Sequence, residues 1–189
     1  RELPVWLLLH RDRAIEDPAG ADLHEVGTVA GVLRYLTAPD GAHHLVCQGQ
    51  YRFRIVKYLP GFPFLVAQVE RIGESEVRTA ELEARILHLK RQANEALELL
   101  PQAPPEIAAA IQGINGGGQL ADLIANVMDL EPAEKQAVLE TIDVTLRMKR
   151  VSELLGHRIE VLRLSRQISQ QTKETVDGRQ REFLSLIHI

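Results

Sequence analysis

The sequence predicts an α+β fold, with an antiparallel β-rich first half and a helical second half. In the first half, residues 51–56 alternate between an aromatic or apolar set and a mostly basic set, which is the period of a strand. Turn-forming residues interrupt the apolar runs at short intervals. After Ser75 the apolar residues recur every three and four positions, which is the period of a helix. The change of period places a boundary near residue 75.

Five apolar runs in the first half have the length of strands. They are residues 3–9, 25–37, 44–47, 50–59 and 64–72. Turn chemistry separates them at Asp17-Pro18, at Pro39-Asp40-Gly41 and at Pro60-Gly61. Short strands at this spacing, with no helix between most of them, favour an antiparallel barrel or sandwich.

The second half predicts a series of helices. An apolar stripe runs from Leu82 to Leu100, where prolines follow, and Pro105 suits the start of a short helix. A second stripe covers residues 120–128, and Pro132 fits the first position of another helix. Asp143 can cap a last, long helix. The resulting division is a β-rich lobe (1–75), a helical bundle (76–168) and a helical linker (169–189).

Composition excludes several classes of protein. Hydrophobic residues make up 45% and charged residues 25%, as in ordinary globular domains, and the net charge of -4 gives no general attraction to nucleic acid. No apolar run is long enough to span a bilayer. The single cysteine, Cys47, forms no internal disulfide, and its apolar surroundings favour packing over a reactive thiol. We expect a cytoplasmic protein without membrane contact.

Motifs for catalysis and cofactor binding are missing. The glycines at 116–118 are followed by Gln119 and no lysine, so a flexible connector is favoured over a phosphate-binding loop. His43 and His44 are adjacent, so on a strand they point to opposite faces and do not chelate one metal together. No serine lies in a nucleophile-elbow motif. We expect no catalytic residue, metal or cofactor in this chain.

Basic residues are concentrated on the predicted last helix. They are Arg147, Lys149, Arg150, Arg158, Arg163 and Arg166. Two interpretations stay open. The cluster is either a solvated face with ion pairs along the helix, or a surface for an acidic partner or the DNA backbone.

Several motifs, in a fixed order, resemble the N-terminal domain of the Lon protease family. In the first half these are Val26-Gly27-Thr28-Val29-Ala30, Ala38-Pro39-Asp40-Gly41 and the segment 49–55. In the second half they are the segments 120–125, 135–140, 143–144, 159–162 and 180–184, the last of which opens the family's linker toward its ATPase module. The family's opening strand would precede Arg1, and the tail 185–189 does not continue the family's charged run. We therefore expect a piece of a longer protein.

The resemblance implies a PUA-like antiparallel β-barrel followed by a helical bundle. It also implies a non-catalytic domain that engages unfolded or tagged protein substrates and helps to organise a hexamer. The parent enzyme would degrade misfolded and regulatory proteins with ATP and Mg at an AAA+ module and a Ser-Lys dyad, neither of which lies in this sequence. One alternative is a stand-alone protein of the same domain family that acts as an adaptor. Another is a nucleic-acid-binding module.

The best local candidate for substrate contact is the connection at residues 58–64, because it holds several of the few aromatic residues of a chain with only 4% aromatics. We name Tyr58, Leu59, Phe62 and Phe64 as contact candidates. Connections usually run over the surface. These side chains therefore either fold back to cap the β-rich lobe or stand exposed for a partner, with Phe62 expected to be the most exposed.

Overall fold

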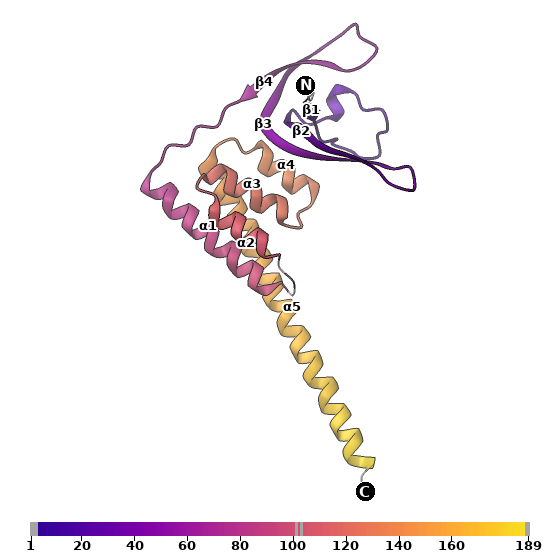
Figure 1. Cartoon of the computed structure of the whole chain (residues 1–189), viewed down its shortest axis with the longest axis vertical. Coiled ribbons are helices and arrows are strands. Elements are labelled where there is room, and N and C mark those ends of the chain that lie inside the picture. The colour runs from indigo at the N-terminus through magenta and orange to yellow at the C-terminus, as the bar shows by residue number, and fades with distance from the viewer. Residues whose placement is uncertain (1–3, 101, 103, 188–189) are drawn as a thin grey trace. The chain divides into compact units, whose positions relative to one another are not determined.

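The computed structural model describes residues 4–100, 102 and 104–187, with side chains as far as residue 175. The chain divides into two compact units. Unit 1 comprises Arg1–Ser75 and Glu131–Asp143, and unit 2 comprises Glu76–Leu130 and Val144–Ile189. The elements of both are labelled in Figure 1.

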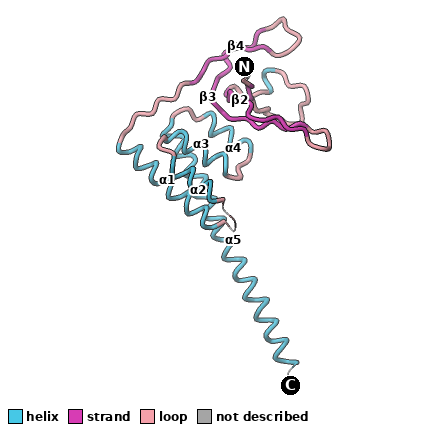
Figure 2. Tube along the Cα trace, viewed as in Figure 1, coloured by secondary structure: helices cyan, strands magenta, loops and turns pink. Residues whose placement is uncertain are grey.

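Unit 1 is built on a four-stranded antiparallel sheet in the order β1-β2-β3-β4. Its strands are β1 (Val5–Leu7), β2 (Val26–Thr37), β3 (His43–Leu59) and β4 (Val66–Ile72). A short 3-10 helix (Gly20–Asp22) lies in the connection between β1 and β2, and Figure 2 shows the strands in magenta. The predicted α+β class, with an antiparallel sheet followed by helices, is confirmed.

The two predicted strands 44–47 and 50–59 are one continuous strand, so the predicted break between them is wrong. The pairing with β2 steps from Val29↔Tyr51 to Ala30↔Gly49, which leaves Gln50 as an extra residue in β3. Such a bulge bends a strand without ending it. Gly49 therefore marks a local irregularity in the ladder. The strand predicted from Phe64 begins at Val66, and the start of the first predicted strand, Leu3, lies outside the described residues.

The two faces of β3 meet different surroundings within unit 1. The apolar face carries Phe53 and Ile55, which form the buried core with Val29. The face predicted to be basic is not free, because Arg52 is only 8% exposed and its Nε donates to the Leu139 carbonyl at 3.0 Å.

Leu139 belongs to α4 (Pro132–Glu140), which the predicted division assigned to the helical bundle. The structure groups α4 with the sheet instead. The buried Gln136 side chain shows why, because its Nε2 donates to the carbonyl of Val26 on β2 at 3.0 Å. A buried carbonyl at the start of a strand needs such a donor, and α4 supplies it. These hydrogen bonds join the short helix to the sheet.

Over its described residues, unit 2 consists of four helices. They are α1 (Ala80–Leu99), α2 (Pro105–Gly113), α3 (Gly117–Val127) and α5 (Val144–Ile187). Each begins within a few residues of the predicted position. The predicted stripes supply much of the core, including Leu82 and Leu89 of α1, Leu120 and Ile124 of α3, and Val151 of α5. Thr79 caps α1, since its side chain accepts a hydrogen bond from the Leu82 amide.

Helix α5 continues without a break through Gly156 and beyond residue 168, where the bundle was predicted to end. In Figure 1 it extends well past the helices with which it packs in unit 2. The side chains of the linker motif 180–184 and the tail 185–189 lie outside the described part of the chain. None of the described helices has an apolar stretch long enough to cross a membrane.

Candidate functional site

An open groove of about 680 Å³ is centred on the loop between β3 and β4 in unit 1. All four predicted contact residues line it. The complete lining is Asp17, Pro18, Ala19, Tyr58, Leu59, Pro60, Phe62, Pro63, Phe64, Leu65 and Val66. The structure therefore brings the predicted residues together and adds a second wall, Asp17–Ala19, from the connection between β1 and β2.

Tyr58 anchors one end of the groove. Its side chain packs against the core formed by Val29, Phe53 and Ile55. The backbone of Gly20 lies close against the ring, because a Cβ at that position would fall 2.5 Å from Cε2 of Tyr58. Burial raises the pKa of the Tyr58 phenol, and nearby Glu25 adds to that rise while Arg11 opposes it. Tyr58 therefore caps the β-rich unit and fixes the start of the loop.

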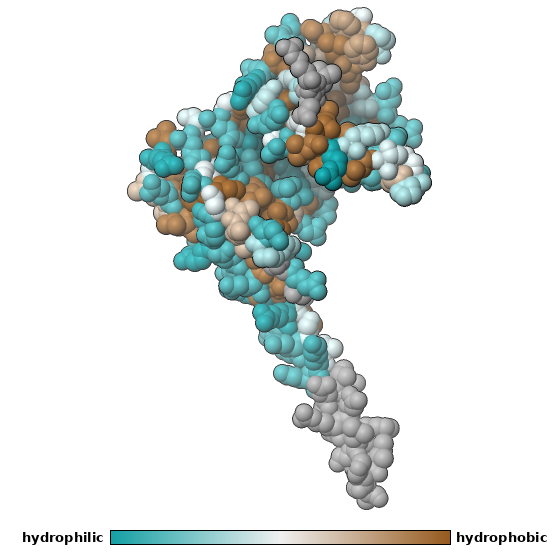
Figure 3. All heavy atoms as spheres, in the orientation of Figure 1, coloured by the Kyte–Doolittle hydropathy of each residue, from teal (hydrophilic) through white to brown (hydrophobic). Residues whose placement is uncertain are grey.

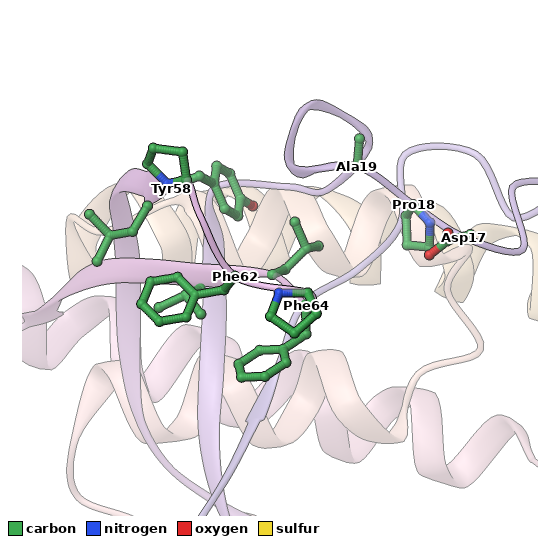
Figure 4. A pocket seen from close by; sticks show the side chains of 11 residues that line it. Asp17, Pro18, Ala19, Tyr58, Phe62 and Phe64 are labelled. Carbon is green, nitrogen blue, oxygen red and sulfur yellow. The ribbon is translucent and has the colours of Figure 1, made fainter.

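Phe62 and Phe64 have the opposite character. Their side chains are 54% and 69% exposed, and their ring centroids lie 6.1 Å apart in a tilted arrangement. Figure 4 shows the two rings next to each other, with Pro18 and Asp17 contributed by the other segment. In Figure 3 hydrophobic residues gather over this loop at the top of the view. Two neighbouring exposed phenylalanines are unusual on a protein surface and mark a candidate binding site.

The loop holds its shape through its own turn residues. Gly61 has a φ of +94°, a conformation that side chains other than glycine rarely adopt. Pro60 and Pro63 restrict the backbone on either side of Gly61 and Phe62. A loop stiffened in this way loses little conformational entropy when a partner binds, because much of it is already ordered.

Both interpretations of the aromatic connection apply, each to different residues. Tyr58 folds back to cap the unit, whereas Phe62 and Phe64 are exposed. Phe64 is more exposed than Phe62, contrary to the predicted order. The wall at Asp17–Ala19 was missed, because a contact between segments some 40 residues apart leaves no trace in local periodicity.

The glycine-rich segment 116–118 is occupied by the protein itself. It opens α3, and the Glu76 carboxylate accepts hydrogen bonds from the amides of Gly117 at 3.0 Å and Gly118 at 3.2 Å. The predicted flexible connector is wrong here, because the second and third glycines are buried in the helix start. A carboxylate at this place satisfies amides that a helix leaves free, and it takes the position an anion would need.

The basic cluster on α5 is partly neutralised within unit 2. Arg147 is fully buried and pairs with Asp122 at 3.4 Å. Arg158 lies 3.9 Å from Asp129, and Arg163 pairs with Glu95. At least three of the six residues therefore meet acidic partners, which favours the interpretation as an ion-paired helix face over a surface for DNA.

The remaining candidate residues from the sequence do not gather into one site in the described part of the chain. His43 and His44 are exposed on β3, and Cys47 is a partly buried free thiol. Within the described residues, no three histidine, cysteine or acidic side chains gather as a metal site would require. The groove itself is mainly apolar, so its geometry suits the binding of apolar side chains.

Residues 2–157 match the family described as the ATP-dependent protease La (LON) substrate-binding domain. The chain is 50% identical over 180 residues to a Lon protease of Methylocella silvestris, covering 95% of this chain and 22% of that protein. It is 52% identical over 182 residues to a Lon protease of Phenylobacterium zucineum, covering 96% of this chain and 23% of that protein. The chain thus spans less than a quarter of the length of these curated relatives.

The fold has a counterpart among solved structures. The N-terminal domain of a Mycobacterium avium complex Lon protease superposes with a TM-score of 0.62 at 24% identity, covering 82% of this chain and 90% of that one. This likeness concerns the fold. The family model, which matches most of the chain, establishes the membership: the chain belongs to the Lon protease substrate-binding domain family.

Proposed function

We propose that this chain binds unfolded or tagged polypeptide segments for an ATP-dependent Lon serine protease. The observation that carries the proposal is the pair of exposed phenylalanines, Phe62 and Phe64, in an open apolar groove beside a firmly anchored tyrosine. Membership in the substrate-binding domain family supports it. Hydrolysis belongs to other parts of the parent enzyme, which would use a Ser-Lys dyad and an AAA+ module with ATP and Mg. We place that enzyme in the cytoplasm as a hexamer.

An open aromatic groove suits clients of many sequences. A site that accepts unrelated unfolded segments needs apolar contact area more than a fixed pattern of hydrogen bonds. Exposed aromatic side chains that become buried on binding contribute about 1–2 kcal/mol each. Single domains should therefore bind weakly, and several domains in one hexamer would bind one client more tightly through their combined contacts.

The test replaces Phe62 and Phe64 singly by alanine and measures binding of a fluorescent unfolded client, such as reduced carboxymethylated lactalbumin, by anisotropy. Each variant should weaken binding about 5–30-fold, the equivalent of 1–2 kcal/mol. The melting temperature should stay within about 2 °C of the parent's, because an exposed ring contributes little to folding.

Leu87→Ala is the matched control, because Leu87 is as exposed as Phe64 at 69% but lies on α1 in unit 2. It should leave client affinity unchanged. Equal affinity of the parent and both phenylalanine variants would remove the groove from the site. A large drop in melting temperature would show that the rings belong to the core.

A further inference from the structure

The outer part of the β2–β3 hairpin, which we call the ribbon, comprises residues 33–37 of β2 and 43–47 of β3. β1 pairs with β2 only at Thr28–Ala30, and β4 pairs with β3 only from Arg52 onward. In the described chain, neither outer edge of the ribbon therefore carries another strand. Unpaired strand edges present backbone N–H and C=O groups that another extended chain can bind.

The pattern of hydrogen bonds identifies which groups point outward. The amide of Ala38 donates to the carbonyl of Ala42 at 2.8 Å next to the turn. In an antiparallel ladder, hydrogen-bonded and non-hydrogen-bonded pairs alternate. Counting away from the turn, the pairs Thr37↔His43 and Tyr35↔Leu45 are non-hydrogen-bonded. The backbone N–H and C=O groups of His43 and Leu45 thus point away from β2, at the free edge of β3.

The ribbon also carries exposed apolar side chains on both faces. Tyr35 and Leu45 are directly paired, so they share one face, and they are 57% and 55% exposed. On the other face Val46 and Leu36 are 45% and 46% exposed. Side chains of an added strand would therefore find apolar neighbours on either side of the sheet.

The two edges of the ribbon differ in regularity. The pairing shifts between Val32 and Arg34 of β2, opposite the consecutive residues Cys47 and Val46, so the extra residue, Leu33, lies on β2. A bulge disturbs the edge that carries it. The β3 edge from His43 to Cys47 has no bulge, proline, lysine or acidic residue, which are the usual features that prevent pairing at exposed edges.

We propose that the β3 edge at residues 43–47 binds an extended apolar segment of a client polypeptide as an additional strand. The proposal rests on the proposed function and adds a second contact site for the client, at the opposite end of β3 from the groove, together with its mode of recognition. Only a peptide backbone supplies alternating donors and acceptors at the spacing of this edge. The side chains of the client are recognised with little sequence preference, through apolar contacts on both faces of the sheet. The preferred clients are strand-forming segments without proline, since each proline lacks an amide donor.

The decisive experiment uses the whole chain and two fluorescent peptides with the same apolar, β-branched side chains. One has a normal backbone and the other is methylated at every backbone nitrogen. The methylated peptide should bind at least about tenfold more weakly, since several backbone hydrogen bonds are lost. Equal binding of both peptides would overturn the strand-addition mode and leave the proposed function standing. Binding of neither peptide would overturn both.

Substitutions in the ribbon test whether the peptide pairs with the β3 edge or with the β2 edge. Leu45→Pro removes the outward amide of β3 without removing a hydrogen bond to β2, and it should weaken the normal peptide about tenfold. Leu45→Ala keeps the amide, and Tyr35→Pro removes an amide of the opposite edge. Each loses one apolar side-chain contact, so each should weaken the peptide by at most about threefold, clearly less than Leu45→Pro. Equal effects of Leu45→Pro and Tyr35→Pro would contradict the assignment. Sedimentation could also contradict the assignment. It would do so if it showed a dimer that Leu45→Pro dissociates but the added peptide does not, because a second copy of the chain would then occupy the edge.

Discussion

Replacing Arg52 by methionine tests how unit 1 holds α4 on its sheet. Arg52 lies on β3, and its guanidinium reaches in two directions. Nε donates to the Leu139 carbonyl at the end of α4, and Nη1 pairs with the Glu74 carboxylate beyond the end of β4. The arginine side chain is 9% exposed and the Glu74 side chain 33% exposed, so the pair is largely screened from water.

The expected loss follows from that burial. Breaking a fully buried pair costs about 3–5 kcal/mol, because one charge is left without a partner. Glu74 is partly solvated, so its contact with water offsets part of this free-energy cost. The orphaned Leu139 carbonyl adds about 1 kcal/mol. Methionine keeps most of the apolar stem, so little packing is lost. We expect Arg52→Met to lower the free energy of unfolding by about 2–4 kcal/mol.

The assay is urea denaturation followed by tryptophan fluorescence. The chain has one tryptophan, Trp6, whose ring lies 4.8 Å from the buried Phe53 ring, so its emission reports unit 1. Arg54→Met is the matched control on the same strand. The Arg54 side chain is 46% exposed, and its ion pair with the solvated Glu70 is long, at 3.7 Å. That control should cost at most about 1 kcal/mol. Equal, small losses for both variants would refute the proposed role of Arg52.

Three further predictions concern stability, and one concerns activity. Gly156→Ala should raise the free energy of unfolding by about 0.5–1 kcal/mol by calorimetry, since its Cβ would meet only an amide nitrogen at 3.6 Å. Gly117→Ala should lower it by about 1–3 kcal/mol, because its Cβ would fall 2.6 Å from the Met148 sulfur. Burial raises the pKa of Glu140, but hydrogen bonds from Gln136 and His24, together with the charges of His24 and Arg11, outweigh it and the net pKa is lowered. The stabilisation is therefore complete above the unfolded value of about 4.3 and is lost as the pH falls through the folded value. Acid titration of Glu140→Gln should show a shallower loss of stability than the parent, and equal slopes would contradict this. The purified chain should hydrolyse neither casein nor ATP, and turnover that co-purifies with the chain would contradict this.

Local patterns in the sequence were sufficient for much of the fold. The period of three and four after Ser75 identified the stripes of α1, α3 and α5, because buried helix faces must be continuous. The period-two pattern of residues 51–56 identified the central strand. Prolines at positions 105 and 132 marked helix starts, where a missing amide costs nothing.

Non-local contacts were beyond the reach of these patterns. The placement of α4 depends on two hydrogen bonds. Gln136 bonds to a residue 110 positions away in the sequence, and Arg52 bonds to one 87 positions away. Their side chains look like ordinary solvated residues in the sequence. The basic appearance of β3 was misleading for the same reason, since Arg52 is held by a helix that the sequence assigns to the other half.

The candidate site was predicted in part. Composition alone pointed to the aromatic connection at residues 58–64, and turn residues placed it at the surface. Which aromatic is anchored and which is exposed depends on Gly20 meeting the Tyr58 ring. The free edge of β3 was also not predictable, because it depends on where the neighbouring strands stop pairing.

The most direct test of the central claim is amide chemical-shift mapping of the isotope-labelled chain during titration with an unfolded client. Binding at the groove predicts the largest changes at residues 17–19 and 58–66, with saturation at the same client concentration for both segments. Changes confined to α1 and α3 in unit 2, with residues 58–66 unaffected at saturation, would contradict the proposal that this groove engages the client.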